Sequence, residues 1–109
     1  MERTEQCAGA KSALEMIGGK WKPPILFLLS QRGTIRFNEL LRSIPNVTQK
    51  ILTENLRELE EHGLVTRRVY PEVPPRVEYA LTEYGRSAVP IVNSLQQWGS
   101  MHRSNREAK

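Results

Sequence analysis

Four polar side chains in the middle of the chain recur at helical spacing and have the chemistry to recognise DNA bases. Lys50, Thr53 and Arg57 are spaced i, i+3, i+7, and Gln49 lies four residues before Thr53. Glutamine can pair with adenine through two hydrogen bonds, lysine or arginine can reach guanine, and a threonine methyl can contact thymine. The same composition also suits a helix face that is merely solvated, so the flanking segments must decide between the two interpretations.

The apolar residues of this segment predict which side of the helix faces outward. Three leucines at helical spacing are expected to line its inner face: Leu52, Leu56 and Leu59. Thr48 is a good N-cap, and Gly63 can end the helix in a left-handed conformation. The acidic residues gather near the C-terminal end: Glu58, Glu60 and Glu61. The N-terminal half, including Thr48, can therefore approach phosphates without repulsion.

A proline-rich segment between two predicted strands forms the second candidate contact. Residues 64–70 are rich in β-branched side chains, and residues 77–81 alternate apolar and polar positions. Pro74 and Pro75 are expected to hold Arg76 out on a stiff loop, where it suits a phosphate or a narrow minor groove. Arg67 and Arg68 alternate sides of the first strand, so at most one of them faces DNA. Our flank candidates are Arg68 and Arg36.

The remaining segments predict an α+β, mainly helical chain. Helices are expected over residues 10–17, 23–32 and 37–44, and a turn at Pro45-Asn46 precedes the helix from Thr48. After the hairpin, Thr82 should cap a last helix to about Met101, which Pro90 should bend or break. The tail from residue 103 is expected to fray. A helix-turn-helix followed by a two-stranded basic hairpin is a winged helix.

Composition places this single predicted domain, residues 1–109, among ordinary globular proteins. The net charge is +4, and residues 20–76 hold ten basic and six acidic residues, which is a modest nucleic-acid signal. We find no transmembrane run, signal region or nucleophile–base pair, so we expect a cytoplasmic, non-enzymatic protein without a cofactor. One cysteine and two histidines forty residues apart predict no metal site.

The sequence also resembles the HxlR-type winged helix-turn-helix regulators of bacteria and archaea. The matching residues span nearly the whole chain: Gly19-Lys20-Trp21, Arg36-Phe37-Asn38-Glu39-Leu40, Leu52-Thr53, Leu56-Arg57-Glu58-Leu59-Glu60, Gly63-Leu64-Val65, Arg67, Pro74-Pro75-Arg76-Val77-Glu78-Tyr79, Leu81-Thr82-Glu83, Gly85 and Trp98. The resemblance implies a homodimer that binds inverted-repeat operators in double-stranded DNA, with the helix from Thr48 in the major groove. It also implies dimerisation through the terminal helices, including residues 82–109. The candidate contacts are Leu14, Val92, Leu95 and Trp98.

Cys7, in an N-terminal arm of residues 1–9, is a candidate redox-sensing residue. Several members of the resembled family sense oxidants or electrophiles through a cysteine just before the first helix, and a thiol there, near Lys11, should react more readily. Ala8 follows Cys7, whereas many relatives have a proline at that position. Two alternatives remain in which Cys7 has no redox role. One is a regulator controlled by a small-molecule effector of unknown chemistry, and the other is a winged helix for protein contact.

Overall fold

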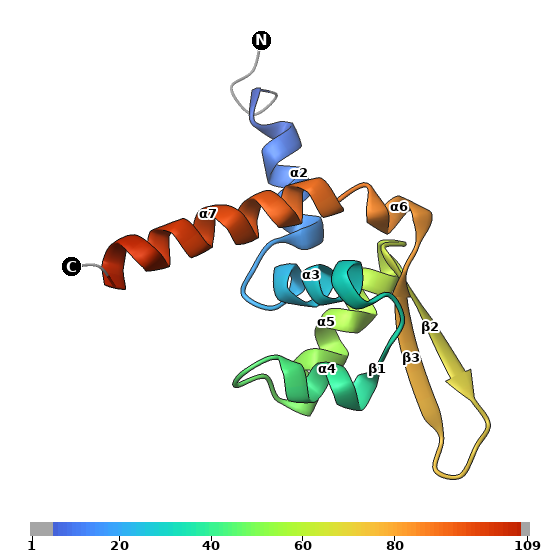
Figure 1. The fold of residues 1–109 in the computed structure, drawn as a ribbon. Helices are drawn as coiled ribbons and strands as arrows, with labels where there is room; N and C mark the ends of the chain where they lie inside the picture. The colour runs from blue at the N-terminus through green and yellow to red at the C-terminus, as the bar shows by residue number, and fades with distance from the viewer. Residues whose placement is uncertain (1–5, 108–109) are drawn as a thin grey trace.

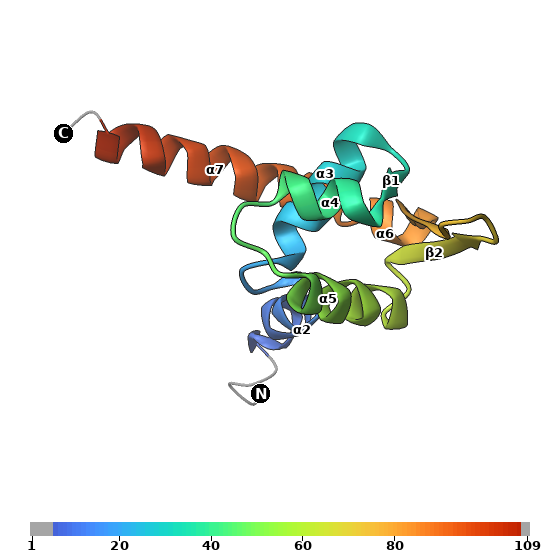
Figure 2. The same ribbon diagram turned by 90° about the horizontal axis from the view of Figure 1, so that it is seen from below.

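The computed structural model describes residues 6–107, which form helices around a small antiparallel sheet (Figure 1). Figures 1 and 2 both show the β2–β3 hairpin and the far end of α7 on opposite sides of the helical core. The elements in chain order are α2 (Ala8–Ile17), α3 (Lys22–Arg32), β1 (Ile35–Arg36), α4 (Phe37–Ser43), α5 (Gln49–Glu61), β2 (Val65–Tyr70), β3 (Arg76–Leu81), α6 (Glu83–Arg86) and α7 (Val89–Glu107).

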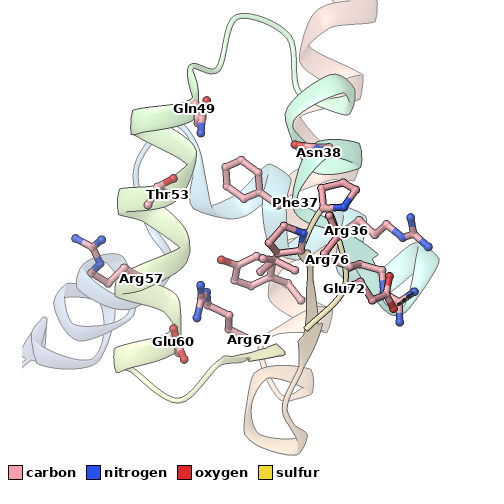
Figure 3. A pocket seen from close by; sticks show the side chains of 15 residues that line it. Arg36, Phe37, Asn38, Gln49, Thr53, Arg57, Glu60, Arg67, Glu72 and Arg76 are labelled. Atoms are coloured by element: carbon pink, nitrogen blue, oxygen red, sulfur yellow. Dashed lines mark ion pairs between the residues drawn. The ribbon is translucent and has the colours of Figure 1, made fainter. Parts of the chain in front are cut away.

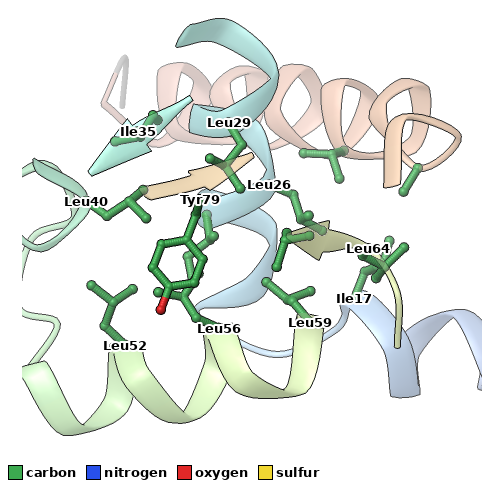
Figure 4. Packing of buried hydrophobic residues seen from close by; sticks show 14 of the residues in the cluster. Ile17, Leu26, Leu29, Ile35, Leu40, Leu52, Leu56, Leu59, Leu64 and Tyr79 are labelled. Carbon is green, nitrogen blue, oxygen red and sulfur yellow. The ribbon is translucent and has the colours of Figure 1, made fainter. Parts of the chain in front are cut away.

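Helix α3 lies at the centre of the core, as its apolar sequence predicts. Its residues Ile25, Leu26 and Leu29 are almost completely buried, and they belong to the same cluster as the three inward leucines of α5 (Figure 4). Burial of one such side chain stabilises the fold by roughly 1.5–3 kcal/mol. The apolar face of α5 is thus committed to the core, and the opposite face is left outward.

Both ends of α5 are fixed by local hydrogen bonds. The Thr48 hydroxyl accepts a hydrogen bond from the Ile51 amide at 3.1 Å, which confirms the predicted N-cap. Gly63 has a φ of 77°, and the Leu64 amide donates to the Leu59 carbonyl at 2.9 Å across this turn. This left-handed ending, predicted from Gly63, directs the chain from the helix into β2.

The sheet has three strands rather than the two of the predicted wing. Its order is β1-β3-β2, with both neighbouring pairs antiparallel. The added strand β1 is only two residues long, too short for an alternating pattern to be recognised. Its Ile35 is buried and pairs with Tyr79, which ties the base of the wing to the start of α4. At the tip of the wing the Val73–Pro74 peptide bond is cis.

The C-terminal segment forms two helices, whereas the sequence predicts one helix after Thr82 that Pro90 bends or breaks. The Thr82 hydroxyl accepts from the Gly85 amide at 2.8 Å, but this cap begins the short α6. A second helix, α7, begins at Val89, so Pro90 lies in its first turn, where a missing amide hydrogen costs nothing. The expected fraying from residue 103 is also wrong, because α7 stays helical to Glu107.

The N-terminal helix begins two residues before the expected start. Cys7 is the N-cap of α2, and its side chain makes no capping hydrogen bond. Residues 1–5 of the predicted N-terminal arm lie outside the described part of the chain, as do residues 108–109 at the other end. None of the helices within residues 6–107 is long and apolar enough to cross a membrane.

Candidate nucleic-acid interface

The hairpin formed by β2 and β3 is called the wing. A cleft of about 730 Å³ separates the outer face of α5 from this wing. The helical wall is lined by four residues of α5, which Figure 3 labels: Gln49, Thr53, Arg57 and the acidic Glu60. The opposite wall comes from Arg67 of β2 and from residues 72–77 at the wing tip. Two elements that are separate in sequence therefore face one polar cleft.

Three of the predicted α5 side chains lie in this cleft and two lie beside it. Gln49, Thr53 and Arg57 fall on one face because they are spaced four residues apart. Lys50 is exposed on the first turn of the helix and does not belong to the cleft lining. The Thr48 hydroxyl is already engaged as the helix cap.

Tyr79 forms the floor of the cleft and was not singled out by the sequence. The residue is only 6% exposed, and its hydroxyl points toward α5 (Figure 4). Burial raises the pKa of this phenol, while hydrogen bonding and the charge of the Arg67 guanidinium act in the opposite direction. The phenol thus stays neutral and offers a polar group between the helix and the wing.

Arg67, rather than the selected Arg68, is the arginine of β2 that faces the cleft. Arg67 pairs with Tyr79 across the sheet, so both side chains lie on the same face. Arg68 points to the other face, where its guanidinium lies 5.6 Å from the Tyr70 ring centroid. The two arginines alternate sides of β2 as expected, and the side that lines the cleft is that of Arg67 and not of the candidate Arg68. The apolar neighbours Val65 and Val69 share the face of Arg67 and could have indicated it.

Arg76 does not project from the tip as expected. It begins β3 opposite Tyr70, and its guanidinium lies 4.0 Å from that ring centroid. Ion pairs at 3.2 Å join it to Glu72 and Glu78. The proline turn therefore presents Val73 at its apex, and the guanidinium is held against the base of the turn.

Arg36 lies at the rim of the cleft, where β1 meets α4. It is exposed and pairs in register with Glu78 of β3. In Figure 3 its side chain extends away from α5. The neighbouring Phe37 and Asn38 complete this part of the lining, and neither was selected from the sequence.

A buried lysine connects α5 to the rest of the fold. Lys22, at the start of α3, is 8% exposed, and its ammonium donates a hydrogen bond to Glu58 at 2.5 Å. This contact lowers the pKa of the Glu58 carboxyl, through the hydrogen bond first and the lysine charge second. The pair spans 36 residues of sequence and fixes α5 against α3.

The terminal helices expose apolar side chains that the described chain leaves uncovered. Five of them are between 47% and 71% exposed: Leu14, Ile91, Leu95, Trp98 and Met101. Val92, a predicted dimer contact, is instead 2% exposed and belongs to the core where α7 packs on α3. Its selection for a surface contact is therefore wrong, because its side chain is already buried within one chain.

Cys7 is a free, exposed thiol at the start of α2. Within residues 6–107, no group of three or more histidine, cysteine or acidic residues is arranged to hold a metal ion. The geometry of the thiol leaves it open to reagents in solvent.

The fold and cleft define a winged helix-turn-helix protein. Residues 16–107 match the family described as HxlR-like helix-turn-helix, and the chain belongs to this family. An HTH-type transcriptional regulator of Methanothermobacter thermautotrophicus is 52% identical over 103 residues, which cover 94% of this chain and 78% of the relative. The protein is therefore a DNA-binding transcriptional regulator, and the expectation that it is not an enzyme is confirmed.

Two solved structures of the redox regulator HypR show the same fold. The reduced form is 46% identical with a TM-score of 0.82, and the match covers 93% of this chain and 99% of the HypR chain. The oxidised form is 47% identical with a TM-score of 0.80, and the match covers 85% and 95% of the two chains.

Proposed function

We propose that the protein acts as a homodimer that recognises inverted-repeat operators, with α5 of each subunit in the major groove. The observation that carries this proposal is the shared cleft. Gln49, Thr53 and Arg57 face outward beside the wing while the opposite side of α5 is buried in the core. Lys50 and the backbone at Thr48 lie at the helix N-terminus, which suits phosphate contact.

The exposed apolar side chains of α2 and α7 support the homodimer. Leu95 and Trp98 lie three residues apart on α7, so they share one face, and Leu14 presents a further apolar side chain on α2. Large apolar side chains exposed together on one helix face are typical of an interaction site. A two-fold dimer would address half-sites about 10–10.5 base pairs apart, or a multiple of that distance.

Redox control through Cys7 is the second part of the proposal. The thiol is exposed and free, and HypR, which is 46% identical, is named a redox regulator. Because each chain has one cysteine, the thiol oxidant diamide would join the Cys7 thiols of two subunits in one disulfide, and the two electrons and two protons released would reduce the diamide to its hydrazine. Such a bond would constrain the two α2 helices relative to each other.

An alternative control by a small molecule is favoured by one separate observation. A pocket of about 410 Å³ lies between α3, the α4–α5 turn and α7, and its lining is mainly apolar. Trp21, Phe27 and Leu28 contribute to it, together with Leu95 of the proposed dimer helix. A ligand in this pocket would change the distance between the α5 helices of the two subunits. Cys7 would then have no regulatory role.

Selection of bound duplexes from a random pool, with reduced and diamide-treated protein, tests these proposals together. We expect an enriched inverted repeat whose affinity changes with diamide in the wild type but not in Cys7→Ser. Equal responses of the two proteins would exclude Cys7 as the responsive residue. A wild-type protein without any sequence preference at low salt would exclude operator recognition.

A further inference from the structure

The distal wing carries no net positive charge with which to attract phosphates. Between residues 69 and 78 the sequence has one cation, Arg76, and two carboxylates, Glu72 and Glu78. The structure pairs the cation with both carboxylates at 3.2 Å and places it over Tyr70. Any contribution of this tip to DNA binding must therefore come mainly from something other than charge.

The apex of the wing presents an apolar side chain instead. Val73 is fully exposed, with a relative accessibility of 101%, and Pro74 and Pro75 follow it directly. Proline restricts the backbone, so little conformational entropy remains to be lost when the tip meets a partner. The tip is thus a stiff, uncharged and fully accessible wedge.

Among possible partners of the tip, its position beside α5 favours duplex DNA. Val73 lines the same cleft as Gln49, Thr53 and Arg57 of α5, on the opposite wall. With α5 in a major groove, a projection from the facing wall reaches the adjacent backbone and minor groove. Apolar side chains that enter a minor groove partly unstack a base step and kink the duplex there.

We propose that Val73 is an apolar minor-groove wedge, and that Arg76 acts as a positioning residue that holds the wedge through Tyr70, Glu72 and Glu78. This inference rests on the proposed operator binding by α5. It assigns the tip of the wing a contact with sugar edges and a base step, and it leaves the phosphate contacts to cations that line the cleft elsewhere, such as Arg57 of α5 and Arg67 of β2. The tip, unlike Arg67 at the other end of the hairpin, therefore contributes to affinity and to DNA distortion with little dependence on salt.

Two wing variants test the wedge on the duplex selected from a random pool by the wild-type protein. Val73→Ala removes two methyl groups from the contact and should weaken binding about tenfold. The slope of log affinity against log salt should stay unchanged, because no phosphate contact is lost. Thr66→Ala is the control, since Thr66 is an exposed β-branched residue of the same hairpin that lies on the face opposite Arg67 and outside the cleft lining. It should bind like the wild type.

Base unstacking gives a second, independent measurement. The adenine analogue 2-aminopurine is placed at successive positions outside the α5 half-site, and its fluorescence should rise at one step with the wild type. The rise should be lost with Val73→Ala and kept with Val73→Ile, which retains a branched apolar side chain.

The possible results separate failure of the wedge from failure of operator recognition. If the wild type selects a duplex but Val73→Ala binds it equally well and unstacks it equally, the wedge is refuted while recognition by α5 stands. Such a result would leave the tip available to a protein partner instead. Equal weakening by Thr66→Ala would also refute the wedge, because it would point to hairpin stability. A wild type that selects no duplex would overturn both proposals.

Discussion

Arg67 and Tyr79 are directly paired across β2 and β3, and their side chains emerge on the face of the sheet that looks toward α5. The phenol is buried up to its hydroxyl, whereas the guanidinium stays exposed at the mouth of the cleft. The pair therefore places a cation opposite Arg57 of α5, on the other wall. The cleft also holds two carboxylates, Glu60 on the α5 wall and Glu72 at the wing tip, so a phosphate strand that enters it would meet both arginines and these acidic groups.

Replacing Arg67 by alanine should weaken operator binding and reduce its salt dependence. Loss of one phosphate contact lowers the slope of log affinity against log salt by about one for each subunit. Arg68→Ala is the control, because Arg68 lies on the opposite face beside Tyr70. Fluorescence anisotropy titrations at several salt concentrations measure both slopes. A reduced slope for Arg68→Ala alone would contradict the assignment of Arg67 to the cleft.

The helical core could be predicted because its signals are local and repeated. Leu52, Leu56 and Leu59 recur at helical spacing, so their burial follows from the sequence alone. Thr48 and Gly63 bound the same helix, because a side-chain oxygen suits an N-cap and glycine suits a positive φ. These local signals predict which face of α5 points outward, and that face is one of the two walls of the cleft.

The other features of the fold and of the candidate site depend on contacts between segments that are far apart in the sequence. Lys22 and Glu58 are 36 residues apart, and no local pattern indicates that a lysine at a helix start becomes buried. The environment of Arg76 likewise depends on strand register, which brings Tyr70 and Glu78 to it. The helical segment is interrupted just before Pro90, but the sequence did not show that Pro90 would begin a second helix, because a proline that begins a helix and one that breaks a helix differ only in where the helix starts.

Replacing Thr53 by alanine should relax sequence preference rather than weaken all binding equally. Thr53 lies between Gln49 and Arg57 on the cleft face of α5, where a methyl and a hydroxyl can meet a base edge. Loss of one such contact costs roughly 1–3 kcal/mol at the matching base pair. Affinities for the selected duplex and its single-base variants measure the effect. Uniform weakening across all sequences would instead assign Thr53 to a phosphate.

The Lys22–Glu58 pair predicts a pH-dependent contribution to stability. Lys22 lowers the pKa of Glu58 below its ordinary value of 4.5, so the pair stabilises the fold fully above that pH. The contribution is lost as the pH falls through the lowered folded-state pKa. Glu58→Gln should therefore unfold at lower urea concentration than the wild type at neutral pH, and the two midpoints should converge once the pH falls below the lowered pKa of Glu58. Glu54→Gln, a change at an exposed position of the same helix, serves as the control.

Gly85 should not tolerate even a methyl side chain. A Cβ at this position would lie 2.0 Å from the Leu64 carbonyl oxygen, which is backbone and cannot rotate away. Relief would require α6 to move from the start of β2, where Thr82 donates to the Gly63 carbonyl at 2.6 Å. We expect Gly85→Ala to lower the free energy of unfolding by about 2–3 kcal/mol. Gly99→Ala is the control, because nothing lies within 4 Å of the added Cβ. Equal unfolding midpoints for Gly85→Ala and the wild type would show that the contact between α6 and Leu64 can adjust to the added methyl group.

A charge on the apolar face of α7 should dissociate the proposed homodimer. Trp98 is 71% exposed, and its large apolar side chain is the kind that dominates protein interfaces. Trp98→Glu would bury a carboxylate at that contact and should weaken dimerisation by about a hundredfold or more. Asn93→Glu adds the same charge on a different side of α7 and should leave the dimer intact. Sedimentation velocity over a range of concentrations measures both variants, together with thermal unfolding to confirm folding. A folded Trp98→Glu protein that sediments as the wild-type dimer would move the interface away from this face of α7.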